Sequence, residues 1–266
     1  MKDITDGRWY LHTANKIQTE NNGDTFLSLL MNVDGISIRN KTDSSIWTFT
    51  MIIMEITRNK RFRIENVVLG GVALCYRKPT KLLMSVMLDN INKQLKLIQN
   101  LNVYYQLKSN ENKNDLLRIY LLSSCSDKPA TAIIQGIPDP SSFFECSIYE
   151  IRGKKSICII AHQQKQIQMR KTPKANATVR TFSTAQLSEM PSQRCEENYQ
   201  KYYSLYQKLL NNNELSTDEI RDQTFGYIDR CSFLQLNYFS YCAGFLIDTL
   251  HTIYHGVWWE AKFYAW

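Results

Sequence analysis

The sequence has 266 residues, of which 44% are hydrophobic, 12% aromatic and 21% charged. This composition is too apolar for an intrinsically disordered chain, and its longest apolar runs are far shorter than the ~20 residues of a membrane-spanning helix. The net charge of +7 fits a polyanionic partner such as nucleic acid, but it also fits an ordinary soluble protein.

The seven cysteines are widely spaced and contain no C-x-x-C pair, which argues against a disulfide framework and for a reducing compartment. The first residues contain no apolar segment of the kind found in a secretory signal peptide. We therefore expect an intracellular protein with no membrane association.

The first 76 residues predict mainly β-structure. Residues 26–33 form an apolar run that ends at Asp34-Gly35, and residues 36–38 alternate, which predicts a hairpin with its turn at Asp34-Gly35. Residues 45–56 and 66–76 are each rich in β-branched and other apolar side chains, and we predict a strand in each.

A helix follows, with Pro79 expected in its first turn, because apolar residues recur at steps of three and four from Leu83 to Ile98. Residues 103–107 and 116–123 are predicted strands, and Asp127 and Pro129 predict the start of another helix. This order of strand, helix, strand and helix predicts an α/β fold.

Beyond Pro140 the chain becomes polar and basic, with a predicted strand at 156–161. We predict an amphipathic helix at 196–210, a short capped helix at 216–221 and a buried aromatic helix at 243–266. The predicted segments are a core at 1–140, a basic and partly helical insertion at 141–223, and a C-terminal aromatic helical segment at 224–266.

Two aspartates stand at the ends of predicted apolar strands. A carboxylate in such a place is costly to bury unless it is paired or binds a metal, so Asp34 and Asp127 are candidates for a Mg²⁺ site. The alternatives are that Asp34 is an ordinary turn residue and that Asp127 only caps a helix.

Further candidates lie in the second half of the chain. Asp248, His251 and His255 share one face of a helix, so they could bind a metal or form a buried Asp–His hydrogen bond. Cys146 has Tyr149 three residues later instead of a second cysteine, which favours a small buried side chain over a zinc ligand.

Residues 153–188 contain no acidic side chain. This stretch is suited to contacts with a phosphate backbone, and it is equally explained as a solvated charged surface. The candidate DNA contacts are Lys165, Arg170, Lys171, Lys174 and Arg180.

Five segments resemble CACTA-type DNA-transposon transposases, in the same order along the chain. In the first segment, residues 4–10 with 32–47, an Asp-Gly pair follows an apolar strand. The second, residues 55–71, is similar to "RFKxENxLLAG", and the third, residues 121–130, is similar to "CDxPA". The last two, residues 143–153 and 233–257, are similar to "GCxxCxxxG" and "GFVIDxMHCxxLGV".

The resemblance implies a ribonuclease H-like mixed sheet flanked by helices and interrupted by an insertion. It further implies Mg²⁺- or Mn²⁺-dependent cleavage and transfer of DNA strands at transposon ends, in the nucleus. Three acidic residues bind two metal ions in such enzymes, and the resemblance makes Asp34 and Asp127 the first two. Asp248 and His251 match the family's D-x-x-H stretch. A homo-oligomer is a further expectation.

Two departures from the family pattern change these expectations. Tyr149 replaces the second cysteine of the paired-cysteine motif, so we expect no zinc site there. The family's third acid, a glutamate on a later helix, has no counterpart up to Trp266, so the chain looks C-terminally incomplete and its activity is expected to be weak or lost. The alternatives are a non-catalytic DNA- or protein-binding relative, or an unrelated α/β protein.

Overall fold

The computed structural model describes residues 3–38, 44–76, 79–101, 103–106, 114–139, 142–144, 146–159, 176–181, 190–212 and 215–247. The contacts divide the chain into two units: unit 1 is Met1–Gly136 with Asp229–Trp266, and unit 2 is Ile137–Ile228. The three predicted segments 1–140, 141–223 and 224–266 therefore map onto two units, because residues 229–247 pack with unit 1.

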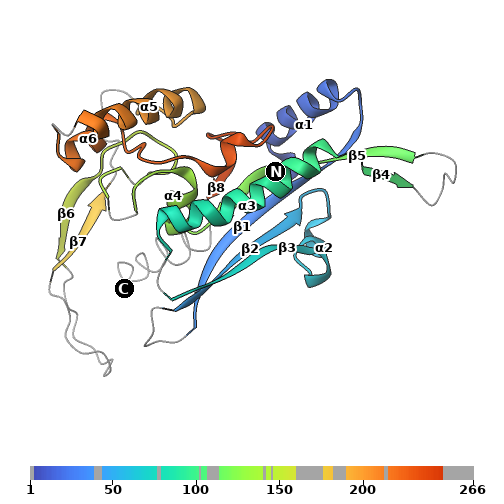
Figure 1. The fold of residues 1–266 in the computed structure, drawn as a ribbon, viewed down its shortest axis with the longest axis horizontal. Coiled ribbons are helices and arrows are strands. Elements are labelled where there is room, and N and C mark those ends of the chain that lie inside the picture. Colours follow the sequence, from blue (N-terminus) through green and yellow to red (C-terminus); the bar gives the residue numbers. More distant parts are fainter. Residues whose placement is uncertain are drawn as a thin grey trace. The chain divides into compact units, whose positions relative to one another are not determined.

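Unit 1 is built around a mixed β-sheet with the strand order β3-β2-β1-β5-β4, in which β8 also pairs with β5 (Figure 1). The pairs β1–β2, β2–β3 and β4–β5 are antiparallel, whereas β1–β5 and β5–β8 are parallel. With its flanking helices this sheet confirms the predicted mixed α/β class. The strands are β1 (Thr25–Ser37), β2 (Ser45–Ile53), β3 (Val67–Cys75), β4 (Val103–Gln106), β5 (Asn114–Ser126) and β8 (Phe245–Ile247).

The predicted turn at Asp34-Gly35 is wrong, because β1 continues through both residues to Ser37. Gly35 pairs with Trp47 on β2, and a Cβ atom on Gly35 would lie 2.6 Å from Cε2 of the Trp47 ring. The glycine is therefore required by a large ring on the neighbouring strand, not by a turn. The strands predicted at 45–56, 66–76, 103–107 and 116–123 are confirmed, with shifts at their ends.

Helix α1 (Arg8–Glu20), which we did not predict, covers one face of the sheet. Its buried residues Tyr10, Thr13 and Ile17 recur at steps of three and four. The Tyr10 hydroxyl donates a hydrogen bond of 2.6 Å to the carboxylate of Glu55, which also accepts bonds from the Ser28 amide and hydroxyl. Burial and this bond to the Glu55 carboxylate raise the pKa of Tyr10.

Helix α3 (Lys81–Asn100) covers the opposite face, where its buried side chains pack against β1, β2 and β5. The helix begins after Pro79, because Thr80 is its N-cap and the Thr80 hydroxyl accepts a hydrogen bond from the Leu83 amide. The predicted placement of Pro79 in the first turn is therefore wrong by two residues. The remaining short helices of this part are η1 (Ile4–Asp6), α2 (Arg58–Arg61) and η2 (Ile64–Asn66).

After α4 (Lys128–Gln135) the chain enters unit 2, and it returns through η3 (Ser232–Gln235) to β8. The predicted helix at 243–266 is wrong for residues 245–247, which form a strand parallel to β5, and residues 248–266 lie outside the described ranges. A Cβ atom on Gly244 would lie 2.5 Å from the Ser240 carbonyl oxygen, so the tight turn that leads into β8 requires glycine here.

Unit 2 contains α5 (Glu196–Asn212), α6 (Thr217–Gln223) and the antiparallel pair β6 (Lys154–Ile159) and β7 (Asn176–Thr181). The predicted helices at 196–210 and 216–221 and the predicted strand at 156–161 are thus confirmed. Ser216 and Glu219 form the predicted capping box. Within the described ranges, no helix of either unit combines the length and apolarity needed to cross a membrane.

The buried side chain of Arg194 organises unit 2. Its guanidinium donates hydrogen bonds to the carbonyl oxygens of Cys146, Phe144 and Phe225 at 2.7, 3.3 and 3.0 Å. It also lies 4.6 Å above the ring of Tyr227. One arginine thus ties together loops that are far apart in the sequence, and its fixed fork of donors suits this geometry.

Candidate functional site

Strands β1 and β5 run parallel, so their carboxyl ends lie at the same end of the sheet, which we call the carboxyl edge (Figure 1). Leu30 of β1 pairs with Ser123 of β5. Asp34 lies four residues after Leu30, and Asp127 lies four residues after Ser123, so the two aspartates are at equivalent positions along the chain. The Val33 amide donates a hydrogen bond of 2.9 Å to the hydroxyl of Ser126, so the residues directly before the two aspartates are in contact. Both candidate carboxylates therefore belong to the same edge.

Asp34 is half-buried and pairs with Thr48 on β2, whose hydroxyl donates to the Asp34 backbone oxygen at 3.5 Å. Because side chains alternate along a strand, Asp34 shares a face with Leu30, which packs beneath α1. The adjacent Val33 is fully buried on the opposite face with α3. Asp34 is thus a strand residue held by its pairing with β2, and the turn interpretation is wrong.

Asp127 is the N-cap of α4. Its Oδ1 accepts a hydrogen bond of 2.8 Å from the Ala130 amide, as the alternative interpretation predicted. The Thr131 hydroxyl donates to the Ser126 carbonyl oxygen at 3.0 Å, which fixes the start of the helix against the end of β5. The positive end of the helix dipole stabilises a negative charge at this position. Capping occupies one carboxylate oxygen and does not prevent the other from binding a cation.

Asn32 and Ser126, which the sequence analysis missed, support this edge. The Asn32 side-chain amide donates a hydrogen bond of 2.6 Å to the Cys125 carbonyl oxygen. Asn32 lies two residues before Asp34, so its side-chain carbonyl oxygen and the Asp34 carboxylate are on one face of β1. The available signal was a polar residue after an apolar run near the end of each strand: Asn32 follows the apolar residues 29–31, and Ser126 is among the serines that follow the apolar residues 119–122.

The donor set at the edge consists of oxygen atoms from Asp34, Asp127 and Asn32. Oxygen ligands of this kind are those that Mg²⁺ and Mn²⁺ prefer. Among the described residues, however, no group of three or more His, Cys, Asp or Glu side chains is placed to hold a metal ion. The part of the edge that the structure describes thus supplies two carboxylates.

The other candidate residues are not brought to this edge by the described structure. Asp248, His251 and His255 lie outside the described residues, and so do Lys165, Arg170, Lys171 and Lys174. The backbone of Arg180 lies on β7, opposite Lys155 of β6. Cys146 is half-buried, and its sulfur accepts a hydrogen bond of 3.4 Å from the Tyr149 amide.

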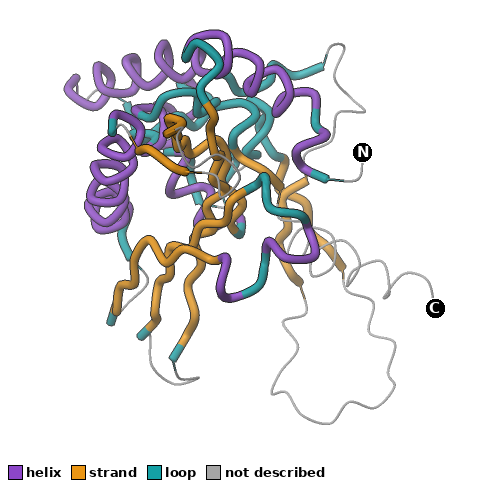
Figure 2. The backbone as a smooth tube through the Cα atoms, turned by 90° about the vertical axis from the view of Figure 1, so that its right-hand side faces the viewer, coloured by secondary structure: helices purple, strands orange, loops and turns teal. Residues whose placement is uncertain are grey.

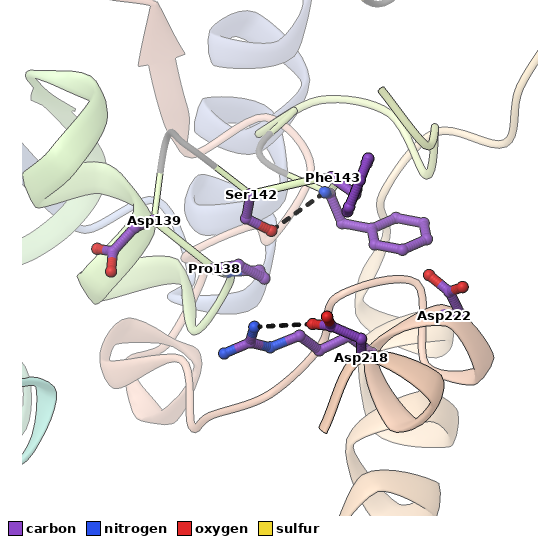
Figure 3. A pocket seen from close by; sticks show the side chains of 8 residues that line it. Pro138, Asp139, Ser142, Phe143, Asp218 and Asp222 are labelled. Atoms are coloured by element: carbon purple, nitrogen blue, oxygen red, sulfur yellow. Dashed lines mark hydrogen bonds and ion pairs between the residues drawn. The ribbon is translucent and has the colours of Figure 1, made fainter. Parts of the chain in front are cut away.

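A pocket of about 230 Å³ lies within unit 2, and none of the candidate site residues lines it (Figure 3). Two of its three carboxylates are paired with arginines: Arg221 lies 3.4 Å from Asp218, and Arg152 lies 3.2 Å from Asp222. These pairs offset the negative charges of Asp218 and Asp222. The lining residues are Pro138, Asp139, Ser142, Phe143, Phe144, Asp218, Arg221 and Asp222.

No protein-family model matches this sequence, and a search of curated proteins finds no match. The resemblance to transposases therefore rests on the motifs of the sequence itself. The geometry of the sheet edge is an independent observation, because it follows from strand pairing and not from the motifs.

Proposed function

We propose that this chain is a transposase-like protein whose unit 1 has a ribonuclease H-like fold and uses Asp34 and Asp127 for metal-dependent chemistry on DNA. The single observation that supports the proposal is that Asp34 and Asp127 stand at the carboxyl ends of neighbouring parallel strands, directly after the hydrogen-bonded residues Val33 and Ser126. The mixed sheet with helices on both faces is compatible with such a fold.

The proposed chemistry is cleavage and transfer of phosphodiester bonds. Asp34 and the Asp127 oxygen that does not cap α4 would hold Mg²⁺ or Mn²⁺, with the Asn32 side-chain carbonyl oxygen as a further ligand. A divalent ion at this edge would activate the attacking oxygen and stabilise the leaving oxygen. Asp127 has a second role, because its capping bond to the Ala130 amide stabilises the first turn of α4.

Two carboxylates neutralise the charge of two divalent ions only in part, so the proposed activity is weak. Asp248 is the residue after Ile247, the last residue of β8, and it is our candidate for a third carboxylate. Asp248 lies outside the described residues, so its position near Asp34 and Asp127 is part of this proposal.

The experiment measures nicking of supercoiled plasmid DNA by the full chain with Mg²⁺, with Mn²⁺ and with EDTA. We expect slow, metal-dependent nicking that Asp34→Asn abolishes and Asp248→Asn reduces. Asp139→Asn is the charge-matched control, because Asp139 is exposed and lies in unit 2, and it should leave nicking unchanged. Nicking that is equal in Asp34→Asn and in the wild-type chain would contradict the proposal.

Two substitutions at Asp127 separate its charge from its cap. Asparagine is as good an N-cap as aspartate, so Asp127→Asn should keep the free energy of unfolding close to that of the wild-type chain while abolishing nicking. Asp127→Ala should lose nicking and also about 1 kcal/mol of stability, because the capping bond to the Ala130 amide is lost. Equal nicking by the wild-type chain and Asp127→Asn would leave Asp127 with a capping role alone.

A second candidate function is non-catalytic binding of DNA or of a protein partner. The observation that favours it is the combination of only two described carboxylates at the edge with the acid-free basic stretch 153–188. Binding of duplex DNA without nicking under any metal condition, unchanged by Asp34→Asn, would select this function over the first.

A further inference from the structure

Strand β3 is the outermost strand on one side of the unit 1 sheet, and thus an edge strand. It pairs with β2 on one side, and no described strand pairs with its other side. About half of the backbone N–H and C=O groups of an edge strand point away from the sheet, and they offer hydrogen bonds to another strand. The strand is nine residues long, Val67–Cys75.

The two edges of this sheet differ in a way that makes β3 unusual. The opposite edge carries short strands, β4 with four residues and β8 with three. Short edge strands, charged side chains and proline are common protections against unwanted pairing. Strand β3 has neither a charged residue nor a proline, and its sequence is VVLGGVALC.

Large apolar side chains of β3 are exposed on one face. Leu69, Val72 and Leu74 are 62%, 58% and 60% exposed, and their register partners Thr50, Thr48 and Ile46 place them on the same face. Figure 2 shows several strands of the structure extending beyond the helices. Contiguous exposed apolar side chains of this kind are a feature of protein interaction sites.

A β-bulge at Gly70 limits the regular part of the edge to Gly71–Cys75. The register shifts between Phe49 and Thr50, and a Cβ atom on Gly70 would lie 2.7 Å from the Met51 side chain. From Gly71 to Cys75 each residue pairs in turn with β2 without a shift. This five-residue stretch is long enough for an average strand pairing.

We propose that a second copy of this chain pairs with β3 in antiparallel fashion, about a two-fold axis at Ala73. In this register Val72 of each subunit lies opposite Leu74 of the other, on the exposed face, and Ala73 lies opposite itself. A two-fold interface needs one patch that is complementary to itself, and the uncharged sequence Gly-Val-Ala-Leu-Cys meets that requirement without like-charge repulsion.

The experiment measures the mass of the full chain by sedimentation equilibrium from about 1 to about 100 μM, a range in which a small interface dissociates. We expect a concentration-dependent monomer–dimer equilibrium. Hydrogen exchange of the amides in residues 71–75 should slow as the dimer forms. Val72→Lys and Leu74→Glu should each weaken the dimer at least tenfold, which corresponds to about 1.4 kcal/mol.

The register is tested by mixing these two variants. In a mixed dimer the lysine introduced at position 72 of one subunit lies opposite the glutamate introduced at position 74 of the other, while the remaining Leu74–Val72 pair is intact. The mixture should therefore dimerise more tightly than either variant alone. Leu97→Lys is the control, because Leu97 is 56% exposed on α3, which covers the opposite face of the sheet, and it should leave the equilibrium unchanged. Circular dichroism confirms that each variant is folded.

Three results would overturn the proposal. The first is a chain that stays monomeric at all concentrations with the β3 amides already protected, which would mean that residues outside the described ranges cover the edge. The second is a monomer with unprotected amides throughout. The third is a dimer that Val72→Lys leaves unchanged, which would place the interface elsewhere.

Discussion

The Val33 amide and the Ser126 hydroxyl form a hydrogen bond of 2.9 Å that joins the strand carrying Asp34 to the strand leading to Asp127. Both groups are buried, so an amide that loses this partner has no water to replace it. We predict that Ser126→Ala lowers the free energy of unfolding by about 1–3 kcal/mol, measured by urea denaturation with tryptophan fluorescence.

Ser123 provides the control for this prediction. It is fully buried in the same strand, and its hydroxyl has no hydrogen-bond partner in the described structure. Ser123→Ala should therefore leave stability unchanged or raise it. If both serine variants lose the same stability, the Val33–Ser126 bond is not what holds this edge together.

The contact between Gly35 and Trp47 gives a second prediction. A Cβ atom on Gly35 would overlap the Trp47 ring, so Gly35→Ala should cost about 1–3 kcal/mol and shift the near-ultraviolet circular dichroism of tryptophan. Gly71→Ala, on β3 at the other side of β2, is the matched control, because its Cβ atom would make ordinary contacts of 3.6 and 3.7 Å. A larger loss in Gly71→Ala than in Gly35→Ala would contradict this reasoning.

A third prediction concerns acid stability. The Arg61 guanidinium, which is buried, makes two hydrogen bonds of 2.7 and 2.9 Å to the Asp3 carboxylate and holds the pKa of Asp3 below its ordinary value of 3.8. A depressed pKa in the folded state means that this stabilisation is present above pH 3.8 and is lost as the pH falls through the folded-state pKa.

We therefore expect Asp3→Asn to be less stable than the wild-type chain at pH 7 by about 1–3 kcal/mol, with the difference shrinking below pH 3.8. Urea denaturation at a series of pH values measures this difference. Glu65→Gln is the control, because the Arg63–Glu65 pair is 3.9 Å apart and more than half exposed, and its removal should change stability little at any pH.

Arg194 gives a fourth prediction, for unit 2. Lysine cannot donate to three carbonyl oxygens in the same fork, so Arg194→Lys should lower the stability of unit 2 by about 2–3 kcal/mol. Faster hydrogen exchange across residues 190–212 and 215–228 would report this loss. Arg152→Lys is the control, since the Arg152 side chain is 56% exposed and its replacement should leave exchange unchanged.

The basic stretch of unit 2 gives a fifth prediction. If Arg170, Lys171 and Lys174 contact phosphates, their replacement by alanine should weaken duplex binding and reduce the slope of log K against log salt concentration by about 2–3. The control triple variant Lys16→Ala, Lys60→Ala, Arg63→Ala removes the same charge from exposed positions in unit 1. Equal losses in both variants would mean that net charge, and not this stretch, determines binding.

Local patterns in the sequence determined most of the elements of this protein. Runs of apolar and β-branched residues predicted the strands at β2, β3 and β5, and the Ser216–Glu219 spacing predicted the capping box of α6. These features depend on neighbours within a few residues, so a single sequence contains them. The Asp127-x-Pro129 pattern likewise predicted a helix cap that the structure confirms.

Only the tertiary structure decided what depends on distant neighbours. Asp34-Gly35 has the composition of a turn, and pairing with Trp47 and Thr48 on β2 keeps it extended. Residues 245–247 have the apolar composition of a buried helix, and the open edge beside Ser124–Ser126 makes them a strand. In both cases the backbone hydrogen bonds supplied by another strand outweigh local preference, which is why neighbouring residues alone could not reveal them.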